Sequence, residues 1–175
     1  MAMEITKDAE VVIRAPYRAS RFEIDRFIDK NYRWMVTHLE KMERQKEARD
    51  ESPYGPITPG LIRKYTDLAK KTIPPRVEQY ARQMGVTYNR ITIRCQKTRW
   101  GSCSSKGNLN FNCLLMLTPA EVQDYVIVHE LAHRKEMNHS SKFWAVVGEI
   151  MPDYKTKVRW LKEHGGEIIN SVQQF

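Results

Sequence analysis

The chain has no long hydrophobic run and few cysteines. A membrane helix needs about 18 consecutive apolar residues, and no stretch of that kind occurs, so we expect no membrane span. The opening MAMEITKDAE lacks a basic segment followed by an apolar one, so we expect a cytoplasmic protein. The three cysteines, Cys95, Cys103 and Cys113, form no CxxC pair and no disulfide framework, and we expect them to be reduced.

The composition is that of a globular protein with excess positive charge. Of the 175 residues 41% are hydrophobic and 29% are charged, which excludes a disordered or fibrous chain and suits one domain. The 29 Lys and Arg exceed the 21 Asp and Glu and give a net charge of +8, which attracts polyanions. Nucleic acid is therefore a possible partner, although the basic residues are scattered and mark no site.

The N-terminal part, residues 1–50, is predicted to be a short strand followed by a long helix. Residues 9–16 are rich in β-branched side chains and end at a proline, which predicts a strand. Ser20 and Glu23 have the spacing of a capping box, and apolar residues then recur at helical spacing, which predicts a helix over residues 21–48.

A proline- and glycine-rich loop at about residues 51–58 separates this part from the rest. Thr58 and Pro59 are a good N-cap and first helical residue, so a second helix is expected to begin there. Pro74-Pro75 should kink or interrupt this helix, because proline lacks the backbone N–H. Gly85 is then expected to end it.

Two strands and a helix are expected between residues 90 and 133. Residues 90–95 and 108–113 alternate with a period of two, and the second puts Leu109 and Phe111 on one face and three asparagines on the other. Thr118-Pro119 provides an N-cap and a proline at the first turn of the following helix. That helix should run through His129-Glu130-Leu131-Ala132-His133.

The sequence HELAHRKEMNH, residues 129–139, carries the candidate chemistry. His129 and His133 are four residues apart, so they lie on one helix face and can share a metal ion. Glu130 lies beside them and can act as a general base towards metal-activated water. A catalytic zinc site needs a third protein ligand in addition to the two histidines.

His139 is the favoured third ligand, and Glu149 on the next predicted helix, at about residues 142–150, is the alternative. On an unbroken helix His139 would point about 240° away from His133, so the helix must end between them. Asn138 tolerates the left-handed conformation and is predicted to end it. Glu136 is expected to face solvent or to orient a ligand histidine.

Several separated motifs occur along the chain. They are Gln96-Lys97-Thr98-Arg99-Trp100-Gly101-Ser102-Cys103, the strand from Asn108 to Asn112, Tyr125-Val126-Ile127-Val128-His129-Glu130-Leu131-Ala132-His133, Asn138-His139-Ser140, Phe143-Trp144 and Pro152-Asp153-Tyr154. Together they resemble the YgjP-like metallopeptidase domain, a family related to the SprT-like proteases and to the zincins. The resemblance extends from about Asp8 to His164.

The resemblance implies a zincin-like α+β fold, with a small and mainly antiparallel sheet packed on the HExxH helix and additional N-terminal and C-terminal helices. It implies that His129, His133 and His139 bind Zn²⁺ and that Glu130 is catalytic. The strand before the active-site helix should then lie at the cleft edge, where a peptide can pair with it. The predicted substrate-binding residues are Asn108, Asn110, Asn112 and Arg99.

We therefore predict a zinc-dependent hydrolase, a metallopeptidase in which metal-activated water attacks a peptide carbonyl. Another divalent metal is possible. One alternative is a metal-dependent hydrolase of nucleoside triphosphates, although the chain has no P-loop. The other is a basic nucleic-acid-binding module with a structural metal. In each case residues 1–175 are expected to form a single domain, with a metal-binding core at about residues 59–164 and a short tail at residues 165–175.

Overall fold

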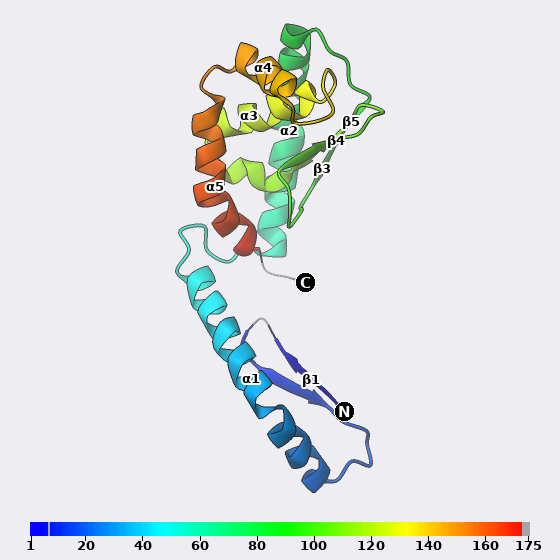
Figure 1. Cartoon of the computed structure of the whole chain (residues 1–175), viewed down its shortest axis with the longest axis vertical. Coiled ribbons are helices and arrows are strands. Elements are labelled where there is room, and N and C mark those ends of the chain that lie inside the picture. The colour runs from blue at the N-terminus through cyan, green and yellow to red at the C-terminus, as the bar shows by residue number, and fades with distance from the viewer. Residues whose placement is uncertain (7, 173–175) are drawn as a thin grey trace. The chain divides into compact units, whose positions relative to one another are not determined.

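The computed structural model describes residues 1–6 and 8–172 and divides into two compact units (Figure 1). The first unit comprises residues up to Pro56, and the second begins at Ile57. The boundary coincides with the predicted loop at residues 51–58. Whether the two units act as one domain stays a prediction.

The first unit contains a hairpin and one long helix. Strand β1 (Ala2–Ile5) pairs antiparallel with β2 (Val11–Arg14), and α1 (Arg21–Asp50) follows. The capping box is confirmed, because the Ser20 and Glu23 side chains each accept a hydrogen bond from the other residue's backbone N–H. The predicted strand and helix are therefore present, and β1 is an additional strand.

The second unit opens with α2 (Pro59–Met84), which Thr58 caps and Gly85 ends in the left-handed conformation. The helix continues through Pro74-Pro75, so the prediction that this pair could interrupt it is wrong. Two helical hydrogen bonds are lost there. The flanking Ile73 and Val77 are fully buried, and this packing stabilises the helix where its own bonds are missing.

The sheet of the second unit has the order β3-β5-β4. Strand β3 (Arg90–Arg94) runs parallel to β5 (Asn108–Asn112), and β4 (Gly101–Cys103) runs antiparallel to β5. Because β5 is the central strand, the expectation that it forms the cleft edge is wrong. The two edge strands are β3, which contacts α2, and β4, which contacts α3.

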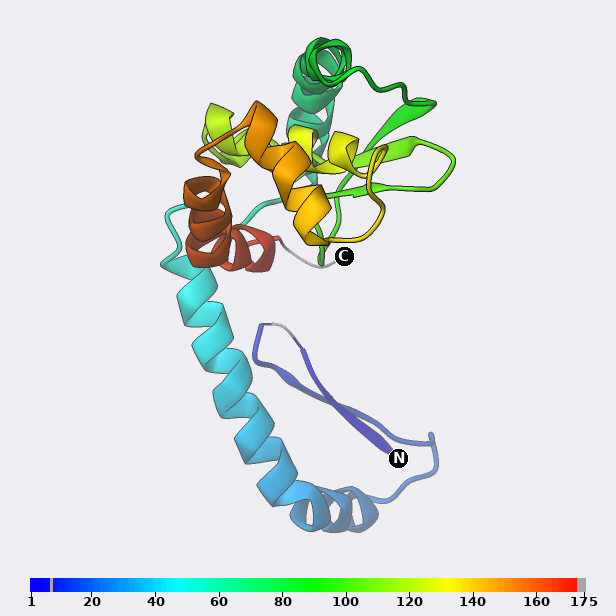
Figure 2. The same cartoon turned by 45° about the horizontal axis from the view of Figure 1, so that its top comes forward.

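Helix α3 (Ala120–Ala132) lies in the middle of the second unit, in contact with α2, α4, α5 and β4 (Figures 1 and 2). A short 3₁₀ turn, η1 (Cys113–Leu117), precedes it, and Pro119 is the N-cap, one residue later than predicted. Helices α4 (Ser141–Ile150) and α5 (Tyr154–Asn170) complete the α+β fold. No helix in the described ranges has the length and apolarity that a membrane span requires.

Buried apolar side chains from α2, β5, η1, α3, α4 and α5 form one core in this unit. The first and last segments of the unit meet at the edge of this core. The Ile57 N–H donates to the Ser171 carbonyl at 2.7 Å, and Ile57 pairs with Val172 in a parallel bridge. The largest fully buried side chains are Phe111, Phe143, Ile57, Ile73, Leu109, Leu114, Leu115, Ile127, Leu131, Ile168, Val77 and Val122.

Candidate metal centre

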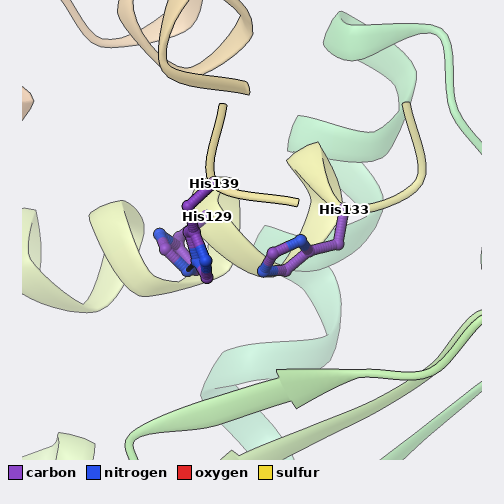
Figure 3. A group of neighbouring side chains, drawn as sticks. All are labelled: His129, His133 and His139. Atoms are coloured by element: carbon purple, nitrogen blue, oxygen red, sulfur yellow. Dashed lines mark hydrogen bonds between the residues drawn. The ribbon is translucent and has the colours of Figure 1, made fainter. Parts of the chain in front are cut away.

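Three histidines converge at the C-terminal end of α3. His129 lies on the helix, His133 is the first residue after it, and His139 comes from the turn that leads into α4 (Figure 3). Their ligand nitrogens all lie within 4.8 Å of one another. The structure therefore brings the three predicted ligands together, and Glu149 is not part of this group.

The helix ends earlier than predicted. It stops at Ala132, and Asn138 does not adopt the left-handed conformation, so its predicted role as the stop is wrong. The chain leaves the helix through a tight turn in which the Lys135 N–H donates to the Ala132 carbonyl. The Ser140 side chain then caps α4. The expected break between His133 and His139 is present, and it begins at the second ligand.

The spacing of the nitrogens suits a shared metal ion. The Nε2 atoms of His129 and His139 are 3.0 Å apart. Two imidazole nitrogens on one tetrahedral zinc, each about 2.0–2.1 Å from the metal, lie roughly 3.3 Å apart. The pair is thus already close to ligand spacing, and the ligand nitrogen of His133 lies within 4.8 Å of both.

Two of the imidazole rings are positioned by hydrogen bonds at Nδ1, the nitrogen on the other side of the ring from Nε2. The Tyr125 hydroxyl lies 3.3 Å from Nδ1 of His129, and Nδ1 of His133 lies 3.2 Å from the backbone carbonyl of Glu136. A metal-binding histidine commonly uses its second nitrogen in this way, which fixes the ring and its tautomer. Of the two roles expected for Glu136, the structure supports the orientation of a ligand histidine. The contact is made by the backbone carbonyl of Glu136 and not by its side chain.

Burial favours the neutral form of His129 and His133. Burial first, and then the neighbouring His133 and His139, lower the pKa of His129 to about 3. Burial also lowers the pKa of His133. Because metals bind the neutral form of histidine, a site with depressed histidine pKa values loses little to proton competition near neutral pH.

Glu130 is buried against the edge strand. Its side chain is 5% exposed, and a Cβ atom placed on Gly101 of β4 would lie only 2.5 Å from its Oε1. Burial raises the pKa of Glu130 to about 8, and the positive charge of Arg99 partly opposes this. A carboxyl group that titrates near neutral pH is suited to both accepting and returning a proton.

The side chains of the three asparagines on β5 all form hydrogen bonds with other residues of the chain. Asn112 is fully buried and donates to the carbonyls of Gln96 and Arg99 at 2.7 and 3.0 Å, which corrects its predicted role as a substrate-binding residue. Asn110 donates to Ser102, and Asn108 accepts from the Asn89 side chain. For these two half-buried residues, and for the exposed Arg99, substrate binding stays a prediction.

Three residues at this site had no role in the sequence predictions. Tyr125 lies one helical turn before His129, and that spacing was a signal that could have identified it. Gly101 leaves room for Glu130, which no sequence pattern indicates. Trp144 of α4 has its ring centroid 5.9 Å from those of both His129 and His139, and only the fold brings it there.

Two solved structures are similar to part of the chain. Both are metallopeptidase zymogens: abylysin of Pyrococcus abyssi, with 25% identity and a TM-score of 0.48, and jannalysin of Methanocaldococcus jannaschii, with 23% identity and a TM-score of 0.45. Each alignment covers 53% of this chain and 94% of the other. No curated protein matches the chain.

Residues 56–164 match the family described as YgjP-like, metallopeptidase domain. The match covers most of the second unit and includes the three histidines and Glu130. The family match therefore indicates that this site hydrolyses peptide bonds with the help of a metal ion. The chain is a member of the YgjP-like metallopeptidase family.

Proposed function

We propose that the chain is a zinc peptidase in which His129, His133 and His139 bind the metal and Glu130 is the general base. The observation that carries the proposal is the convergence of three histidine side chains beside a buried glutamate. Peptides or proteins are the substrates. A cytoplasmic location, which suits three free cysteines, is part of the proposal.

The residues present fit zinc. Three imidazoles are the ligand set of one group of catalytic zinc sites, and three protein ligands leave a coordination position open. When bound, zinc supplies Lewis acidity that stabilises negative charge developing on the substrate carbonyl. Another divalent metal that accepts imidazole ligands would also fit this set.

Glu130 moves the proton during hydrolysis. Its carboxylate accepts a proton from the attacking water as the water oxygen bonds to the carbonyl carbon. The protonated carboxyl group then donates that proton to the amide nitrogen as the C–N bond breaks, and the amine leaves neutral. The low-dielectric surroundings of Glu130 keep both protonation states accessible near neutral pH.

Strand β4 provides the edge along which a peptide can bind. At the two ends of its antiparallel pairing with β5, the Asn112 N–H donates to the Trp100 carbonyl and the Ser104 N–H donates to the Asn108 carbonyl. The alternation of such a ladder directs the N–H and C=O groups of Gly101 and Cys103 to the other side. An extended substrate that pairs there would pass directly over Glu130, with Arg99 beside it.

The general-base role is tested by Glu130→Gln. Glutamine keeps the size of the side chain but cannot accept the proton, so peptide hydrolysis should fall by roughly 10²–10⁴-fold while metal content is unchanged. Peptide cleavage by mass spectrometry and metal content by elemental analysis are measured on the same sample. Unchanged turnover in this variant would refute the base assignment.

The ligand set is tested by a matched pair of alanine variants. His139→Ala should lower metal affinity strongly, because it removes a ligand, and Glu149→Ala should leave it unchanged. X-ray absorption on the metal-loaded protein should show three nitrogen ligands and one further light atom. A closed shell of four protein ligands would contradict a catalytic site.

The family match gives no support to nucleic-acid binding.

A further inference from the structure

A hollow of about 410 Å³ opens beside the metal centre, between α4 and α5. We call it the basic hollow. Its lining combines an apolar part with three cationic side chains, and five of its residues come from α5. The lining residues are Trp144, Tyr154, Lys155, Val158, Arg159 and Lys162.

Trp144 connects the basic hollow to the metal centre. Its ring lies 5.9 Å, centroid to centroid, from His129 and from His139, and it stacks on Tyr154 at 5.2 Å with an angle of 13°. The hollow thus begins one aromatic ring away from two metal ligands. Side chains two residues apart on one face of an extended peptide are about 6.6–7 Å apart. A substrate residue near the scissile bond can therefore reach the hollow.

The charge of the basic hollow is not neutralised by the protein. Lys155, Arg159 and Lys162 are exposed, recur at the spacing of one helix face, and form no ion pair within the part of the chain that the structure describes. The nearby carboxylate of Asp153 is paired with Lys157, which does not line the hollow. No acidic residue contributes to the lining.

We propose that the basic hollow is a substrate subsite that selects an aspartate or glutamate side chain one or two residues from the scissile bond. The guanidinium of Arg159 can bind a carboxylate through two parallel hydrogen bonds, with the two lysines adding charge. The rings of Trp144 and Tyr154 and the Val158 side chain cover the methylene groups of the bound residue. This inference rests on the proposed peptidase function and specifies its substrates as acidic peptides.

The test uses the full chain loaded with zinc and a set of peptides that differ only in Glu, Gln or Lys at positions flanking the cleaved bond. A charge-assisted hydrogen bond in a partly exposed site should favour Glu over Gln by about tenfold in kcat/KM at one position, and Lys should be poorest. The preference should shrink as salt rises to about 1 M, because the charges are accessible to solvent.

Variants assign the preference to the hollow. Arg159→Gln should lower kcat/KM for the Glu peptide about tenfold, mainly through KM, and leave the Gln peptide within about twofold. Arg159→Glu should shift the preference towards the Lys peptide. Lys142→Gln is the matched control, because Lys142 is exposed on α4 but does not line the hollow, and it should change nothing.

The possible failures are distinguishable. If peptides are cleaved without an acidic preference, or if Arg159→Gln affects the Glu and Gln peptides equally, the subsite is refuted and the peptidase function stands. If no peptide is cleaved, the proposed function is refuted and the subsite with it. If nucleoside triphosphates are hydrolysed instead, and Arg159→Gln impairs that reaction, the hollow binds phosphate and the proposal is overturned.

Discussion

The two units differ most in what they bury. In the second unit α2, α3 and β5 supply a continuous core of fully buried side chains. In the first unit no apolar side chain that the structure describes is buried. Tyr17 and Phe22 are 104% and 75% exposed. The shifted pKa values of His129 and Glu130 depend on burial. The chemistry is therefore found in the unit that has a core.

A matched pair of phenylalanine variants should show the largest difference between the units. Phe111→Ala empties part of the β5 core and should lower the free energy of unfolding by roughly 3–5 kcal/mol. Phe22→Ala removes an exposed ring and should change it by less than about 0.5 kcal/mol. Urea denaturation of both variants measures this, and equal losses would contradict the contrast in burial.

Glu130 should make the stability of the metal-free protein depend on pH. Its pKa is about 8 in the fold against 4.5 for the unperturbed group, so the folded state holds the proton more tightly. Stability should therefore fall as pH rises between those two values, by on the order of 5 kcal/mol in total, with no effect below the lower one. Glu130→Gln should remove this slope. Denaturation at a series of pH values checks it, and identical slopes in the two proteins would count against a buried carboxyl.

Gly101→Ala tests how closely the edge strand confines the base. The added methyl group would meet the Glu130 carboxylate, so the side chain must move. A displacement of about 1 Å can cost on the order of 10²-fold in turnover, and we expect that loss in kcat with unchanged metal content. Gly166→Ala, where an added Cβ meets nothing within 4 Å, is the control and should retain activity.

Two helix caps allow the finest comparison. Ser20→Ala in the first unit and Ser140→Ala in the second each remove a side-chain cap and should each cost about 1 kcal/mol of stability. Only the Ser140 variant should also weaken metal binding, by a few fold, because Ser140 follows His139 in the turn. Metal titrations with a competing chelator measure this, and equal affinities would show that the cap does not hold the ligand.

Local chemistry made the helices and part of the site predictable. Ser20, Thr58 and Gly85 signalled helix ends through bonds to neighbouring residues, and the structure confirms all three. The four-residue step from His129 to His133 likewise follows from helix geometry alone. These features need no information about distant parts of the chain.

Long-range packing set the features that were missed. Strand β5 is central because β3 and β4 pair on either side of it, and nothing in residues 108–112 specifies those partners. The same pairing places the Asn112 side chain inside the protein. Helix α3 ends before Asn138 because the turn after Ala132 satisfies its own backbone groups, which has no distinct residue signature.

The bond between the Ile57 N–H and the Ser171 carbonyl has a consequence for how this unit can be engineered. Because the two ends of the second unit meet, its chain could be rejoined there by a short linker and opened at a surface loop elsewhere. A circular permutant opened away from residues 129–139 should keep its metal-binding histidines in place. Ends that meet in this way also suit insertion of the unit into a loop of another protein.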